Sequence, residues 1–171
     1  MNWAAVAVGL SLAQTAIYVG TAAVALAQLR EARRARQFDT TRGLIAHAFD
    51  PLFYRAVQFV FNDLDARLGD PAYAAELASP RGWDVDAERH PELIVLGRLE
   101  EIGTYVKYGH VAEDALFDNL AALVVGAWEQ LATVVRLSRG AHPDDPDAHV
   151  WANAELLYDR ARAWRARASG A

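Results

Sequence analysis

Acidic pairs and histidines are the side chains that could carry chemistry in this sequence. Glu100 and Glu101 are adjacent, and neighbours on a helix point about 100° apart, so these carboxylates are not expected to share one site. A carboxylate-bridged pair of metal ions needs Glu-x-x-His on two helices, and the sequence contains no such motif. The histidines are scattered, mostly beside predicted helix ends: His47, His90, His110, His142 and His149. We therefore expect no metal site.

Nucleophiles and cofactor motifs are equally scarce. The sequence has no cysteine, no Gly-x-Ser-x-Gly motif and no glycine-rich loop that could hold a phosphate. We predict no catalytic residue and no cofactor, and an enzyme with an unrecognised site remains an alternative. The net charge of −5 argues against nucleic acid as a partner, because proteins that bind nucleic acid usually carry a basic excess.

The N-terminal segment is uncharged and is followed at once by arginines. Residues 3–29 contain no charged side chain, and about 20 apolar residues of helix suffice to cross a bilayer. The arginines that follow are Arg30, Arg33, Arg34 and Arg36. Since no basic residue precedes the apolar segment, the positive-inside rule predicts an N-terminus outside and a C-terminal domain in the cytoplasm. The expected location is the inner membrane of a bacterium.

Two alternatives to a membrane anchor remain open. A cleaved signal peptide would use small residues such as Ala23, Ala25 and Ala27 at its cleavage site, but its basic residues should precede the apolar segment. A buried core helix is the other alternative, because Gln14, Thr15, Thr21 and Gln28 make the segment less apolar than a typical membrane span.

Two stripes of residues run along the predicted anchor. Gln14, Thr21 and Gln28 recur every seven residues and form a polar stripe. A second stripe consists of small residues: Gly9, Ala13, Ala16, Gly20, Ala23 and Ala27. Small residues allow close helix packing, and side-chain amides form hydrogen bonds between helices in lipid. We therefore expect the anchor to pack against its own copies or other membrane-protein subunits, although an alanine-rich composition alone would also produce much of this pattern.

The remainder of the chain shows helical periodicity and no strand-like alternation. The predicted fold is all-α, with an N-terminal transmembrane helix that continues into a cytoplasmic bundle of four to five helices. The expected helices after residue 48 cover about 53–68, 72–78, 91–109, 113–139 and 147–168, and their apolar stripes include Phe61, Val95, Leu99 and Leu131. The predicted domain boundaries are 1–29 (anchor), 30–49 (basic juxtamembrane helix), 50–168 (bundle) and 169–171 (tail).

Several short motifs in the bundle suggest a family. These are Leu99-Glu100-Glu101-Ile102-Gly103, Gly109, Glu113-Asp114 and Trp128-Glu129. The chain resembles a bacterial family of small, N-terminally membrane-anchored helical proteins with a conserved domain of unknown function. The resemblance implies a membrane-tethered helical domain and no particular activity or ligand. Ala112 stands where such families usually have a capping Asp, so Glu113 or Asp114 would have to replace that cap.

The leading functional hypothesis is a non-enzymatic, membrane-anchored interaction or scaffold protein. Its partners would be the lipid bilayer and either further copies of the chain or the other subunits of a larger membrane complex. An alternative is a small homo-oligomeric channel lined by Gln14, Thr21 and Gln28, although no ionisable residue would line such a pore. A second basic cluster on the last helix, formed by Arg160, Arg162, Arg165 and Arg167, could meet the membrane or an acidic partner.

Overall fold

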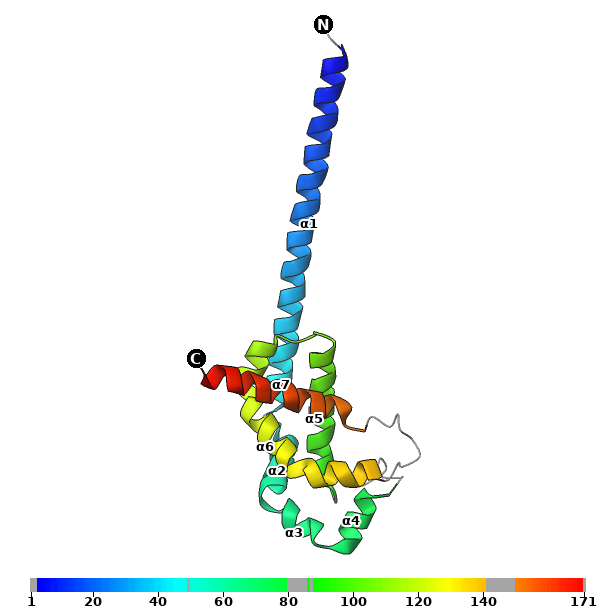
Figure 1. Cartoon of the computed structure of the whole chain (residues 1–171), viewed down its shortest axis with the longest axis vertical. Helices are drawn as coiled ribbons and strands as arrows, with labels where there is room; N and C mark the ends of the chain where they lie inside the picture. The colour runs from blue at the N-terminus through cyan, green and yellow to red at the C-terminus, as the bar shows by residue number, and fades with distance from the viewer. Residues whose placement is uncertain (1–2, 49, 80–85, 87, 141–149, 171) are drawn as a thin grey trace.

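The computed structural model describes residues 3–48, 50–79, 86, 88–140 and 150–170; within its first helix, side chains are described for residues 14, 15 and from 17 onward. Helix α1 (Trp3–His47) is unbroken over 45 residues, about 65 Å long, and extends far beyond the remaining helices (Figure 1). The prediction of one continuous helix from the apolar segment through the arginines is confirmed.

Two Asp-Pro pairs start the next helices. Asp50 accepts hydrogen bonds from the backbone N–H groups of Leu52 and Phe53, and Pro51 occupies the first turn of α2 (Pro51–Asn62). Asp70 caps α4 (Pro71–Leu77) in the same way. An Asp cap satisfies N–H groups that lack a partner at a helix start, while proline gives up no hydrogen bond there.

The core lies among α2 and three longer helices, α5 (Pro91–Lys107), α6 (Glu113–Gly140) and α7 (Ala152–Ser169). Helix α5 packs against both α2 and α7, and α6 packs against α7. The predicted stripes are buried, with Val95, Leu99 and Leu131 almost completely removed from solvent. The all-α prediction is confirmed, since the described residues form helices and no strand.

Three details of the sequence prediction were wrong. Six helices follow α1 in the described residues, one more than expected, because the helix predicted for 53–68 breaks at Asp63 into α2 and α3 (Leu64–Leu68). Phe61 is 44% exposed, and its ring lies over Gly126 at the edge of the core. Helix α7 begins at Ala152 because Trp151 has a left-handed backbone (φ 63°); the rest of its predicted start, 147–149, lies outside the described residues.

One described helix, α6, is long and apolar enough to cross a membrane, although 44% of its apolar window is buried inside the molecule. Leu116, Leu120 and Val124 of this helix lie in the core, so its apolar character has an explanation within the fold. The predicted anchor at 1–29 lies only partly within the described side chains.

Candidate functional site

The predicted anchor residues lie on a helix that extends away from the domain. Thr21, Ala23, Ala27 and Gln28 are exposed, and a Cβ atom at Gly20 would meet no atom within 4 Å. The side chains of Ala13 and Ala16, and the surroundings of Gly9, lie outside the described residues. No other described element of the chain therefore covers the described part of the predicted packing stripe.

Two polar side chains of the predicted anchor form hydrogen bonds within α1. Gln14 Nε2 donates to Tyr18 Oη at 2.9 Å, and Thr21 Oγ1 donates to the Ile17 carbonyl at 2.8 Å. Such bonds reduce the cost of placing polar groups in an apolar environment. Gln14 and Thr21 therefore need a partner helix for hydrogen bonding less than the sequence alone indicates.

Helix α1 joins the domain just after the four arginines that follow the uncharged segment, here called the arginine collar (Arg30, Arg33, Arg34 and Arg36). Arg30, Arg33, Arg34 and Arg36 are all exposed. Immediately below them, Gln37 Nε2 donates to the Gly109 carbonyl at 2.8 Å, and Ala112 N–H donates to Thr41 Oγ1 at 2.9 Å. Thr41 is 1% exposed and Leu44 is part of the core.

The position of Ala112 explains how α6 starts without the expected Asp. Ala112 N–H donates a hydrogen bond to Thr41 of α1. Glu113 and Asp114 lie in the first turn, where their negative charge interacts favourably with the helix dipole. The start of α6 is thus stabilised by an inter-helix hydrogen bond that sequence reasoning did not anticipate.

A groove with a volume of about 580 Å³ lies where α1 meets the end of α5 and the turn between α5 and α6 (residues 108–112, the α5–α6 turn). Its α1 wall includes Leu29, Arg33 and Arg36, and its other wall includes Tyr105 and His110. Residues 29, 33, 36 and 40 follow the 4-3-4 spacing of one helical face, which explains why they line the groove together. The groove begins at the last apolar residue of the predicted anchor.

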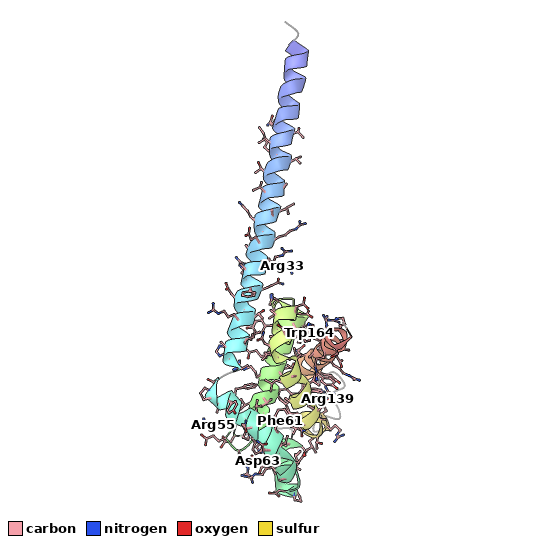
Figure 2. The ribbon with its side chains drawn as sticks, turned by 90° about the vertical axis from the view of Figure 1, so that its left-hand side faces the viewer. Arg33, Arg55, Phe61, Asp63, Arg139 and Trp164 are labelled. Atoms are coloured by element: carbon pink, nitrogen blue, oxygen red, sulfur yellow. The ribbon has the colours of Figure 1, made fainter. Side chains whose placement is uncertain are left out.

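The second arginine cluster lies at the same end of the domain. Arg160 Nη1 is 3.2 Å from Glu113 Oε2, which places the middle of α7 beside the start of α6. Figure 2 shows Trp164 of α7 at the end of the domain from which α1 departs, below Arg33. Arg162, Arg165 and Arg167 are exposed. Both basic clusters therefore lie close to the point where α1 leaves the domain.

The two glutamates of the Leu-Glu-Glu-Ile-Gly motif have separate roles, as their predicted divergence requires. Glu101 forms an ion pair with Arg98 at 2.5 Å. Glu100 accepts hydrogen bonds from the backbone N–H groups of Asn153 (3.3 Å) and Ala154 (2.8 Å). Glu100 therefore caps the start of α7 from a different helix.

Gly103 permits this close approach of α5 and α7. A Cβ atom at position 103 would overlap the backbone carbonyl of Asn153. The Asn153 side chain also donates to Glu100 Oε1 at 2.7 Å and to Thr104 Oγ1 at 3.2 Å. The motif thus forms a clamp between α5 and α7, here called the α5–α7 clamp (Glu100, Gly103, Thr104 and Asn153).

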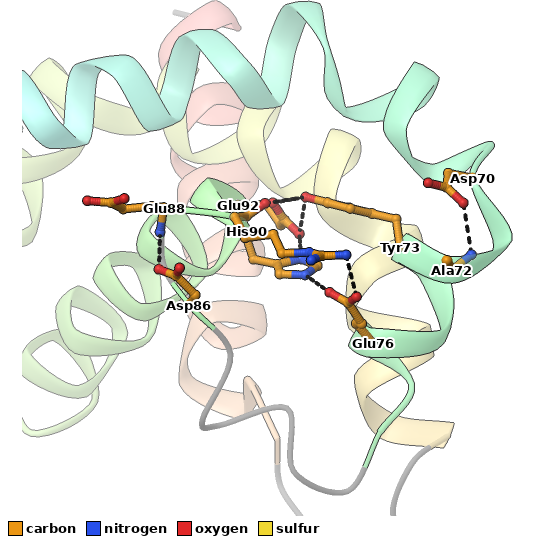
Figure 3. Close-up of polar contacts among 9 residues, drawn as sticks. Asp70, Ala72, Tyr73, Glu76, Asp86, Glu88, His90 and Glu92 are labelled. Carbon is orange, nitrogen blue, oxygen red and sulfur yellow. Dashed lines mark hydrogen bonds and ion pairs between the residues drawn. The ribbon is translucent and has the colours of Figure 1, made fainter.

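A buried polar network joins α4 to the start of α5 (Figure 3). Tyr73 Oη donates to the Glu92 carboxylate, at 2.7 and 2.8 Å from its two oxygens. His90 Nδ1 lies 2.8 Å from Glu92, and His90 Nε2 lies 2.9 Å from Glu76. Arg89 pairs with the other oxygen of Glu76. The Tyr73 and His90 rings stack with centroids 4.3 Å apart.

Burial determines what this network can do. His90 and Glu92 are 0% exposed, so each depends on its partners to offset the loss of water. Both ring nitrogens of His90 lie within hydrogen-bond distance of carboxylate oxygens, so neither nitrogen is left without a polar neighbour. Burial, the hydrogen bond to Glu92 and the charge of that carboxylate raise the pKa of Tyr73 far above its ordinary value. The network holds α4 against α5.

Sequence reasoning missed this network. It treated His90 as one of the scattered histidines. The available signal was the pair Tyr73 and Glu76, three residues apart on one predicted helix face. Their partners lie 14–19 residues later, across a predicted loop whose path the sequence does not determine. In the part of the chain that the structure describes, no cluster of three metal-ligating side chains is found.

Comparison with known proteins identifies a family for this chain. A family model described as "Domain of unknown function (DUF4760)" matches residues 15–161, so the match covers the collar, the groove, the α5–α7 clamp and the buried network. Comparisons with curated proteins and with solved structures find no match. The expected resemblance to a family with a conserved domain of unknown function is confirmed in that form. The chain belongs to the DUF4760 family.

Proposed function

We propose that this protein is a membrane-tethered helical module in which α1 crosses the bilayer and the remaining helices form an interaction domain at the membrane surface. The observation that carries the proposal is the exposure of apolar side chains on the extended part of α1. Ile17, Val19, Val24 and Leu29 are each more than half exposed. Lipid would cover this surface and provide the free energy of burial that the fold does not.

The charge distribution supports an orientation for the module. The arginine collar follows the uncharged segment directly, and the arginines of α7 lie at the same end of the domain. Basic residues at this position favour a domain on the cytoplasmic side and an N-terminus outside, in a bacterial inner membrane. The domain would then lie close to the lipid headgroups.

The proposed role is non-enzymatic: the protein self-associates or serves as an accessory subunit of a larger membrane complex. The small residues along α1 permit close packing with another helix in lipid. A channel lined by Gln14, Thr21 and Gln28 gains no support, since Gln14 and Thr21 form hydrogen bonds within their own helix. The most strongly buried polar groups, His90 and Glu92, are closed to solvent, which does not favour an active site there.

Membrane extraction tests the anchor. The full chain, expressed in bacteria, should remain in the membrane pellet after alkaline carbonate washing. Ile17→Arg should release a large fraction of the protein, because a central arginine costs about 2.5–3.5 kcal/mol in a membrane-spanning helix. The matched control is Ala46→Arg, at an exposed position on the same helix beyond the collar. Complete release of the unmodified chain by carbonate would refute the anchor.

Self-association has a separate test. Two copies with different C-terminal tags, co-expressed and solubilised in a mild detergent, should copurify with each other or with the same set of membrane proteins. A chain that resists carbonate but is monomeric and partnerless in detergent would retain its anchor and lose the proposed role as an interaction protein.

A further inference from the structure

The groove between α1 and the α5–α6 turn has the charge of an anion site. Arg33 and Arg36 are three residues apart on the face of α1 that lines it. Neither guanidinium forms an ion pair or hydrogen bond with another described residue, and no aspartate or glutamate lines the groove. Two unpaired guanidinium groups on one wall create a positive potential and present several N–H donors to an anion.

The opposite wall consists of rings rather than charges. The His110 ring lies 6.4 Å from the Tyr105 ring and 6.3 Å from the Tyr108 ring, measured between centroids. Tyr108 does not line the groove; it lies beside His110 and is 63% exposed. Tyrosine is enriched where the hydrocarbon of a membrane meets the headgroups, because its ring is apolar and its hydroxyl is polar. The groove therefore combines anion-binding donors with side chains suited to a membrane interface.

One end of the groove is apolar. Leu29, 68% exposed, and Ala32 line the end nearest the uncharged segment, whereas Gln37 and Thr40 line the far end, about 12–17 Å away along the helix axis. A free phosphate ion would gain nothing from exposed Leu29. A phosphate that carries acyl chains would place them along Leu29 and the apolar segment, with its charge at the arginines.

We propose that this groove binds the phosphate group of an anionic phospholipid from the leaflet on the domain side. The proposal depends on the anchor proposed above, because α1 must cross the bilayer for Leu29 to lie at the hydrocarbon boundary. Arg33 and Arg36 bind the phosphate, and Tyr105 and His110 form the wall opposite them. Arg30 and Arg34 belong to the same collar but do not line the groove, so they contribute only general attraction to the surface.

Lipid retention measures this site directly. The full chain is reconstituted in vesicles of 70% phosphatidylcholine and 30% phosphatidylglycerol, transferred to a mild detergent, and examined by native mass spectrometry. We expect one phosphatidylglycerol per chain, retained in preference to phosphatidylcholine. The double variant Arg33→Gln/Arg36→Gln should retain at least about tenfold less, given the loss of two headgroup contacts.

The matched control is Arg30→Gln/Arg34→Gln, which removes the same charge from the same helix outside the groove. Retention close to that of the unmodified chain supports the site, and an equal loss in both double variants overturns it in favour of general attraction. Binding of inorganic phosphate alone, with an affinity that displaces the lipid, would also overturn the lipid assignment. Flotation with pure phosphatidylcholine vesicles tests the anchor separately. If all variants float but the unmodified chain retains no phosphatidylglycerol, the proposed lipid site is wrong and the anchor is unaffected.

Discussion

The substitution Gly103→Ala tests the α5–α7 clamp most directly. The added methyl group would lie closer than 3.0 Å to the carbonyl group of Asn153, a distance that real Cβ atoms essentially never show. The atoms it meets belong to the backbone, so α7 itself has to move. That movement would separate Glu100 from the N–H groups of Asn153 and Ala154, which it bonds at 3.3 and 2.8 Å.

Two effects contribute to the expected loss of stability. Overpacking of a close helix contact costs about 1–3 kcal/mol. Loss of a carboxylate cap costs about 0.5–2 kcal/mol. We expect the free energy of unfolding to fall by about 3 kcal/mol, a substantial part of the 5–15 kcal/mol available to a typical protein. For a chain of this size, the midpoint of thermal unfolding should fall by about 6–12 °C.

The full chain in mild detergent provides the assay, with thermal and urea unfolding followed by circular dichroism and tryptophan fluorescence. Gly97→Ala is the matched control, because Gly97 belongs to the same helix, is exposed, and has no atom within 4 Å of the position of a Cβ atom. This control should be neutral or more stable by up to about 1 kcal/mol, owing to the better helix propensity of alanine. A Gly103→Ala protein as stable as the Gly97→Ala protein would refute the clamp.

Two further predictions concern the buried network and the docking of α1. Burial and Glu92 raise the pKa of Tyr73, so this tyrosine stays neutral in the folded state while it ionises near pH 10 in the unfolded chain; stability should therefore fall above pH 10 by about 1.4 kcal/mol per pH unit. Tyr73→Phe should remove this decline in stability. In the folded state, the tyrosinate absorbance of the variant near pH 10 should equal that of the unmodified chain, because a buried Tyr73 does not ionise there. A smaller tyrosinate absorbance in the folded variant would contradict the burial of Tyr73. Thr41→Val should destabilise the domain by about 1–3 kcal/mol in urea unfolding, because it leaves Ala112 N–H without its acceptor, whereas Thr41→Ser keeps the hydroxyl and most of the stability.

Local rules account for the parts of the fold that the sequence predicted well. The buried stripe of α5 depends only on helical spacing, so the sequence was enough to predict it. The partial exposure of Phe61 depends instead on how α2 meets α6, where the Phe61 ring packs on Gly126. Helical periodicity carries no information about that contact.

The candidate site likewise has one part that local sequence predicts and another that depends on how the helices pack. Spacing and charge identified the collar, and the groove wall formed by Arg33 and Arg36 follows from it. The opposite wall, with Tyr105 and His110, depends on where the α5–α6 turn meets α1. The buried contact between His90 and Glu92 and the function of Gly103 likewise require the arrangement of several helices, which one sequence without its fold does not supply.

The unbroken course of α1 has a mechanical consequence. Gln37 and Thr41 bond to the α5–α6 turn, and no break separates them from the collar or from the extended apolar part of the helix. Rotation or tilt of the extended part must therefore displace this turn or break these hydrogen bonds. The turn leads through Glu113 to Arg160 of α7, so α1, the groove and the second basic cluster are joined by direct contacts. A partner that reorients α1 would consequently change the groove together with the buried contacts of Thr41 and Leu44.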